Sequence, residues 1–265
     1  MSREAAIGIF DSGVGGLTVV HALLATLPAE HLVYLGDTGR TPYGTKSAET
    51  VTRYSLENVD FLLARSIKLL VVACNTASSV ALDAIAARAG VPVVGVIEPG
   101  ARAAVEHSRS RRVGVIGTEA TIAAGAYTRA LRALDSRIEV YTRACPLFVP
   151  LAEEGWIDGP IVRQVADTYL ASLARSGIDT LILGCTHYPL LRRTIAESMG
   201  EGVALVDSAE ETAREVRAVL EREARARPDG PGSTSFFVTD VPDRFVRIGQ
   251  HFLGSRVQSA VRIER

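Results

Sequence analysis

Short runs of β-branched and other apolar residues alternate along the chain with longer segments whose apolar positions recur at the period of a helix. The runs are almost continuously apolar, which is typical of strands covered by helices on both faces. This alternation predicts βαβ units and mainly parallel sheets. The predicted strands are 7–10, 32–35, 69–73, 93–96, 113–116, 138–141, 180–183 and 203–206, with a late strand at 236–239. The predicted helices are 17–27, 47–64, 77–88, 120–134, 159–176, 190–198 and 210–225.

The second half of the chain repeats features of the first half. The run IGIFD at 7–11 resembles VGVIG at 113–117, and LVVACNT at 70–76 resembles LILGCTH at 181–187, with nearly the same displacement. Valine-rich strands followed by helices recur in unrelated α/β proteins, so a chance likeness is the alternative, and the matched cysteines argue against it. The repeat predicts an α/β fold with two similar domains related by a pseudo-two-fold axis. We expect residues 1–98 plus 208–265 to form one domain and 99–207 the other.

Each repeat ends a strand with a cysteine that polar residues follow, at Cys74 and Cys185. The carboxyl edge of an open α/β sheet is where such folds bind ligands, so two facing domains would place both thiols in one interdomain cleft. Inversion of an α-carbon needs a base on one face and an acid on the other. A thiol, whose ordinary pKa is about 8.5, can serve as either. A structural role for each buried cysteine is the alternative.

Composition excludes several other classes of protein. The chain has 265 residues, 29 Lys and Arg against 30 Asp and Glu, and a net charge of -1, so no overall positive field would attract nucleic acid. The N-terminus lacks a signal-peptide pattern, and no apolar run approaches the roughly 20 residues of a spanning helix. We expect a cytoplasmic protein without a membrane partner. Three cysteines without a C-x-x-C spacing suggest neither disulfides nor a metal site.

The glycine-rich run GVGGLT at 13–18 could be taken for a dinucleotide-binding loop. Thr18 stands where that motif needs its last small residue, although Asp37 partly matches the expected acidic position, so NAD binding stays an alternative. We interpret the glycines as a tight turn that serves the substrate or the cleft wall. No nucleoside triphosphate loop is present, and neither Lys46 nor Lys68 lies in a context suited to pyridoxal phosphate. We therefore expect no cofactor.

Five segments together carry a family resemblance. They are FDSGVGG at 10–16, DTGRTPYG at 37–44, CNTAS at 74–78, CPLFVPLAE at 145–153 and GCTHYP at 184–189. In this order they resemble the signature segments of bacterial glutamate racemase, a member of the aspartate/glutamate racemase superfamily. The resemblance extends over about residues 7 to 224.

The resemblance implies a cofactor-independent enzyme that interconverts L- and D-glutamate and supplies D-glutamate for peptidoglycan synthesis, commonly as a homodimer. By resemblance, Cys74 would deprotonate D-glutamate and Cys185 L-glutamate. Cys145 is predicted to be a packed residue, with a redox or metal-binding thiol as the alternative. The residues implied in catalysis are Cys74, Cys185, Asp11, His187 and Glu153. The residues implied in substrate binding are Asp11, Ser12, Tyr43, Gly44, Asn75, Thr76, Thr186 and His187.

General chemistry agrees with these substrate contacts, and three rival functions remain. Helix N-termini after Thr76 and Thr186 would offer free N–H groups to carboxylates. An aspartate racemase would share the paired cysteines, although the runs around them favour glutamate. A thiol hydrolase or acyl transferase would use Cys185 with His187 as its base. A binding role is the third, because some glutamate racemases bind gyrase, a partner that the composition neither supports nor excludes.

Overall fold

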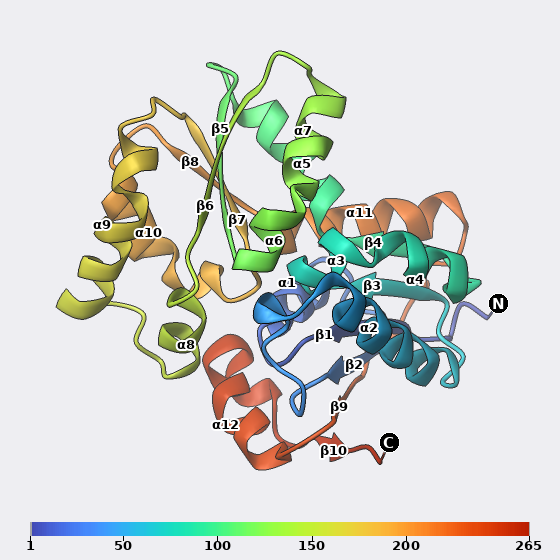
Figure 1. Cartoon of the computed structure of the whole chain (residues 1–265). Coiled ribbons are helices and arrows are strands. Elements are labelled where there is room, and N and C mark those ends of the chain that lie inside the picture. Colours follow the sequence, from blue (N-terminus) through green and yellow to red (C-terminus); the bar gives the residue numbers. More distant parts are fainter. Residues whose placement is uncertain (1, 265) are drawn as a thin grey trace.

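The computed structural model describes residues 2–264, whose strands form two parallel sheets (Figure 1). The first sheet has the order β10-β9-β2-β1-β3-β4 and the second the order β6-β5-β7-β8. Every pairing is parallel. The strands are β1 Ile7–Asp11, β2 Leu32–Gly36, β3 Leu69–Val72, β4 Val93–Gly95, β5 Arg112–Gly117, β6 Glu139–Ala144, β7 Thr180–Gly184, β8 Ala204–Asp207, β9 Thr234–Val238 and β10 Val261–Arg262.

Helices connect successive strands and cover the sheets (Figure 1). The α-helices are α1 Leu17–Thr26, α2 Ala48–Leu63, α3 Asn75–Val80, α4 Leu82–Ala89, α5 Ile97–His107, α6 Glu119–Ala124, α7 Ala126–Leu134, α8 Phe148–Glu153, α9 Pro160–Ala174, α10 Arg192–Met199, α11 Ser208–Arg222 and α12 Pro242–Leu253. Three short 3₁₀ helices are η1 Tyr43–Thr45, η2 Tyr188–Leu191 and η3 Gly254–Arg256. Within residues 2–264, no helix combines the length and apolar character that a membrane crossing requires.

The internal repeat of the sequence corresponds to a repeat of topology. Strands β2-β1-β3-β4 of the first sheet have the same order as β6-β5-β7-β8 of the second. The two echoed runs therefore occupy equivalent strands, β1 with β5 and β3 with β7. Strand β9 pairs with β2, which returns the C-terminal segment to the first sheet. We propose that residues 1–98 plus 208–265 form one domain and residues 99–207 the other, a division that this topology supports.

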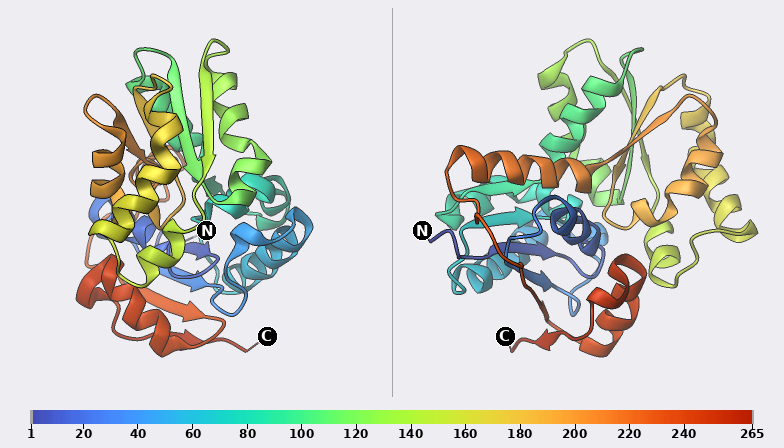
Figure 2. Two further views of the ribbon diagram at one scale, coloured as in Figure 1. Left: turned by 60° about the vertical axis from the view of Figure 1, so that its left-hand side comes forward. Right: turned by 180° about the vertical axis from the view of Figure 1, so that it is seen from behind.

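The hydrophobic core has three parts. One cluster fills the space between the sheets, and there Ile7 and Ile9 of β1 join Val113 and Val115 of β5 with residues of α1, α5 and α11. The opposite face of the first sheet packs against α2 and α4, and the opposite face of the second packs against α9 and α10. Helix α11 lies along the first sheet and reaches the second (Figure 2). This cluster includes residues of both β3 and β7, so the two strands pack against one shared core.

The structure corrects two of the predicted helices. Helix 120–134 is two helices, α6 and α7, because Gly125 adopts a left-handed conformation with φ of 64° and ends the first of them. Helix 77–88 is also two helices, α3 and α4, which meet at Ala81, where φ is -122°. In both cases the first, short helix begins two or three residues after the end of a strand. This brings its first turn to the sheet edge.

Candidate functional site

A cavity lies where the carboxyl ends of the two sheets meet. Cys74 follows β3 and Cys185 follows β7, and both thiols line this cavity. The structure therefore brings the two matched cysteines together at one site. Of the other residues implied in function, all but Asp11 and Glu153 also line it. The lining consists of Ser12, Thr41, Pro42, Tyr43, Gly44, Cys74, Asn75, Thr76, Thr118, Val149, Cys185, Thr186 and His187.

On the Cys74 side, the acidic group whose charge acts on the thiol is the fully buried Asp11 at the end of β1. Asp11 Oδ2 accepts a hydrogen bond from Gly13 N at 3.1 Å, whereas its Oδ1 has no hydrogen-bond partner within residues 2–264. Burial raises the pKa of Asp11, although the charge of His187 opposes the shift. Burial and, next, the charge of Asp11 raise the pKa of Cys74 to about 12. Cys74 is therefore a thiol at neutral pH.

On the Cys185 side, His187 links the thiol to a carboxylate. His187 Nδ1 lies 3.8 Å from Cys185 Sγ, and its Nε2 lies 3.2 Å from Glu153 Oε1. Burial alone would lower the pKa of His187, but the contacts with Cys185 and Glu153 outweigh it and raise that pKa to about 10. Burial would raise the pKa of Glu153, but the contacts with His187 and Arg244 outweigh burial and lower that pKa. A positively charged imidazole therefore faces Cys185 at neutral pH.

The raised pKa of His187 predicts a pH-dependent contribution to stability. Folding favours protonated His187, so this contribution is complete below the unfolded pKa of about 6.5 and is lost as the pH rises through about 10. The free energy of unfolding of His187→Asn should fall furthest below that of the wild type near pH 6. The gap should narrow steadily toward pH 10. Urea titrations of both proteins across this range measure it, and a constant gap would contradict the assigned shift.

Uncharged polar groups form much of the remaining lining. Asn75 Oδ1 accepts a hydrogen bond from Tyr127 at 2.7 Å, whereas its Nδ2 has no hydrogen-bond partner within residues 2–264. Thr76 Oγ1 lies 3.0 Å from Thr118 Oγ1 and 3.2 Å from Thr121 Oγ1. These hydroxyls and the amide can form directed hydrogen bonds with a small zwitterion without adding charge.

The glycine-rich run contributes to the wall between the two halves of the site. A Cβ added at Gly15 would lie 2.4 Å from both Thr186 Oγ1 and His187 Cε1, so only glycine allows this close approach. Thr18 Oγ1 donates to Thr186 O at 3.1 Å. Gly44 meets the opposite half in the same way, because a Cβ there would lie 2.7 Å from Thr118 Cβ. No residue of the run lines the active-site cavity itself, but Gly15 and Thr18 contact Thr186 and His187, which do.

Neither Asp11 nor Glu153 lines the cavity, but Glu153 contacts His187 and Asp11 precedes Ser12, both of which do. Four lining residues were not among the predicted site residues, namely Thr41, Pro42, Thr118 and Val149. The internal repeat carries a signal for one of them, because Thr118 follows β5 as Ser12 follows β1. The other three lie inside motifs already singled out, at 37–44 and 145–153.

Cys145 is buried, as predicted, and does not line the cavity. Its Sγ lies 3.8 Å from Arg143 O, and its backbone oxygen accepts a hydrogen bond from Tyr188 at 2.9 Å. Burial raises the pKa of Cys145 to about 12, so it is an unreactive thiol at neutral pH. Among residues 2–264, no group of three or more His, Cys, Asp or Glu is placed to hold a metal ion.

Comparison with known proteins places this arrangement in a family. The family model for Asp/Glu/Hydantoin racemase matches residues 7–216. A glutamate racemase of Geobacter metallireducens is 59% identical over 95% of this chain and 94% of its own length. Among solved structures, the RacE1 glutamate racemase of Bacillus anthracis has a TM-score of 0.96 at 40% identity, with 99% of this chain and 98% of that chain covered.

A glutamate racemase of Francisella tularensis, solved in complex with D-glutamate, has a TM-score of 0.93 at 36% identity and covers 99% of this chain and 98% of its own. The match therefore extends over nearly the whole chain. These similarities confirm the resemblance found in the sequence. The chain belongs to the Asp/Glu/Hydantoin racemase family.

Proposed function

We propose that the chain is a glutamate racemase that interconverts L- and D-glutamate with Cys74 and Cys185 as its two acid/base groups. The observation that carries this proposal is the shared cavity, which two thiols line from equivalent strand ends of two repeated sheets. The similarity to glutamate racemases along nearly the whole chain supports glutamate as the substrate. The product would supply D-glutamate for peptidoglycan synthesis in the cytoplasm, and we expect a homodimer.

In the proposed reaction, the thiolate on one face removes the α-proton and the thiol on the other face donates a proton to the resulting carbanion. The two sulfurs thereby exchange protonation states, and the opposite direction uses them in reversed roles. Cys185 would act on L-glutamate and Cys74 on D-glutamate. Because the pKa of Cys74 is raised to about 12, Cys74 is already protonated at neutral pH. The free enzyme is thus prepared to donate a proton from Cys74 when L-glutamate binds.

Asp11, His187 and Glu153 would support these thiols. His187 places a positive charge 3.8 Å from Cys185 Sγ, where negative charge resides when this thiol serves as base. Glu153 holds the imidazole from its other nitrogen. Asp11 has a raised pKa, so it can hold a proton beside Cys74. Ser12, Tyr43, Gly44, Asn75, Thr76 and Thr186 would bind the carboxylates and the ammonium group.

Deuterium incorporation tests the proposed function. Purified protein incubated with L- or D-glutamate in D₂O should place deuterium at Cα and yield the opposite enantiomer, as followed by NMR and circular dichroism. A thiol hydrolase or acyl transferase would leave Cα untouched. A parallel incubation with L-aspartate distinguishes an aspartate racemase, which would invert that amino acid in preference to glutamate.

We also predict that the reaction needs no metal or pyridoxal phosphate. Dialysis against EDTA should leave the racemization rate unchanged, because thiols alone supply both proton transfers in this proposal. The purified enzyme should show no pyridoxal absorbance band. If activity is lost on dialysis and returns only with added metal or pyridoxal phosphate, the cofactor-independent mechanism is wrong.

A further inference from the structure

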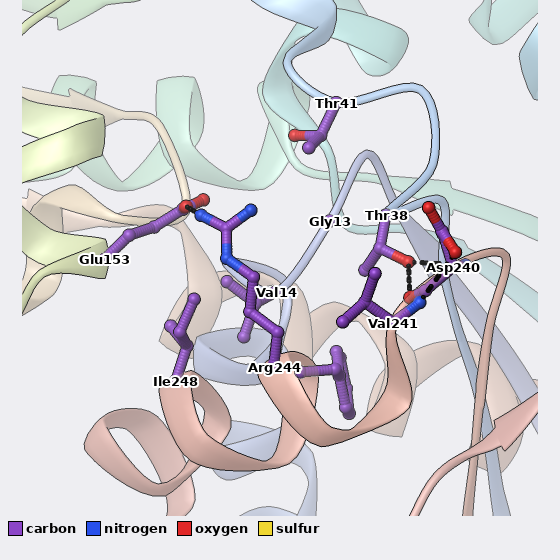
Figure 3. Close-up of a pocket in the computed structure, with 10 residues that line it drawn as sticks. Gly13, Val14, Thr38, Thr41, Glu153, Asp240, Val241, Arg244 and Ile248 are labelled. Carbon is purple, nitrogen blue, oxygen red and sulfur yellow. Dashed lines mark hydrogen bonds and ion pairs between the residues drawn. The ribbon is translucent and has the colours of Figure 1, made fainter.

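A second cavity lies beside the active-site cavity and shares Thr41 with it. We call this space the vestibule. Helix α12 forms one side of it and the end of α8 forms another, and the side chains of Arg244 and Glu153 point toward each other across it (Figure 3). The vestibule is lined by Gly13, Val14, Thr38, Thr41, Glu153, Asp240, Val241, Arg244, Phe245 and Ile248.

A continuous series of polar contacts runs from the vestibule to Cys185. Arg244 Nη2 lies 3.3 Å from Glu153 Oε2, and Glu153 Oε1 lies 3.2 Å from His187 Nε2. The other ring nitrogen of His187 lies 3.8 Å from Cys185 Sγ. Each oxygen of Glu153 thus contacts one cation. The Arg244 side chain is 51% exposed and that of Glu153 is 15% exposed, so the series begins at the surface.

The other charged groups near Glu153 make different contacts. Asp240 also lines the vestibule, but its Oδ1 accepts a hydrogen bond from Val241 N at 3.0 Å and lies 3.9 Å from Arg262 Nη2. His251 of α12 lies next to Gly155, just after the end of α8. Within residues 2–264, Glu153 forms its ion pairs with His187 and Arg244. The pair with Arg244 joins α8 to α12, a helix that follows the first sheet's strand β9, and the pair with His187 joins α8 to the loop after β7.

We propose that Arg244 is a positioning residue, which holds Glu153 across the vestibule so that this carboxylate keeps the His187 imidazole against Cys185. A glutamate side chain held at only one oxygen can rotate, whereas contacts at both oxygens fix its carboxylate plane. Arg244 touches neither thiol and would act through Glu153. Its kinetic consequence rests on the proposed racemase function, but its effect on His187 does not.

The first test follows the His187 ring by NMR and requires no turnover. The chain has five histidines, and a His187→Asn spectrum identifies the signal. Because Arg244 helps to lower the pKa of Glu153, Arg244→Gln should move the acid transition sensed by the His187 ring to higher pH. We expect a shift of about 0.2 to 0.7 pH units, the size appropriate to a partly exposed ion pair. Arg244→Lys should return the transition most of the way to its wild-type pH. Arg247 is exposed on the same helix, and Arg247→Gln should leave the transition unchanged.

The second test measures single-turnover deuterium wash-in. Arg244→Gln should slow proton removal from L-glutamate about two- to fivefold more than removal from D-glutamate. In a Glu153→Gln background, the same change should have no further effect, because the series is already broken. An unmoved His187 transition in Arg244→Gln, or an undiminished effect in the Glu153→Gln background, would overturn the proposal. If the wild type exchanges neither enantiomer, the racemase function fails, and the NMR titration alone decides the role of Arg244.

Discussion

Alanine in place of either Cys74 or Cys185 is expected to abolish racemization. Each thiol lines the same cavity, and inversion of Cα requires a proton acceptor on one face and a proton donor on the other. Loss of one group should lower kcat by at least about 10²- to 10⁴-fold, the usual contribution of a positioned acid or base. The hydroxyls and amide of Ser12, Asn75 and Thr76 cannot substitute, because these groups do not ionise near neutral pH.

Cys145→Ala is the matched control for these two variants. All three cysteines are buried, so each change removes one thiol from the interior and carries a similar risk to folding. Cys145 lies outside the active-site cavity, and its substitution should leave kcat and KM near the wild-type values. Far-ultraviolet circular dichroism and urea titration should show that all three variants fold. Normal turnover by either Cys74→Ala or Cys185→Ala would refute the two-base mechanism.

The sequence predicted the parallel sheets because their strands are short, apolar and buried on both faces. All residues of β1 and β7 are buried, and the pattern located both strands to within one residue. Strand β6 was predicted at 138–141 but spans Glu139–Ala144, because its exposed edge position tolerates Thr142 and Arg143. Polar residues on an edge strand weaken the apolar pattern on which the prediction depends.

The sequence did not predict helices α5, α8 and α12, for related reasons. Pro99 and Gly100 lie in the first half of α5, and Pro150 lies inside the short α8, so local preferences oppose a helix. Tertiary packing overrides them, because Phe148 of α8 and Phe245 of α12 are buried. The helical repeat of α12 can be recognised in hindsight, since Phe245, Ile248 and Phe252 share one buried face.

The site could be anticipated wherever a residue type and its position along a strand carried the chemistry. Cys74 and Cys185 follow equivalent strands, and the repeat predicts their convergence if the two domains face each other. The contacts of Glu153 could not be derived in this way, because its distance from His187 depends on a loop and on α8 rather than on a strand. The same holds for Arg244, which lies on α12, far from both cysteines in the sequence.

Substitution of the two supporting groups is expected to separate the faces of the reaction. His187→Asn should slow proton removal from L-glutamate more than from D-glutamate, because it removes the positive charge that lies 3.8 Å from Cys185. Asp11→Asn should do the reverse, because an amide cannot hold the proton that Cys74 must release before it acts as base. The raised pKa of Asp11 is what makes that carboxylate a competent acceptor. We expect proton removal on the affected face to slow about 10- to 100-fold, which is equivalent to one or two pKa units in proton affinity.

The measurement must isolate each proton abstraction, because at steady state the reaction's equilibrium constant fixes the ratio of the two kcat/KM values. Deuterium wash-in from each enantiomer under single-turnover conditions, with initial rates in both directions, meets this need. The result also distinguishes two roles for Asp11. If Asp11 acted only through its negative charge, which raises the pKa of Cys74, Asp11→Asn would ease ionisation of that thiol and speed removal from D-glutamate. A slower rate indicates proton transfer through the carboxyl group. If both variants slow both abstractions equally, the assignment of one thiol to each enantiomer is wrong, although the racemase function would stand.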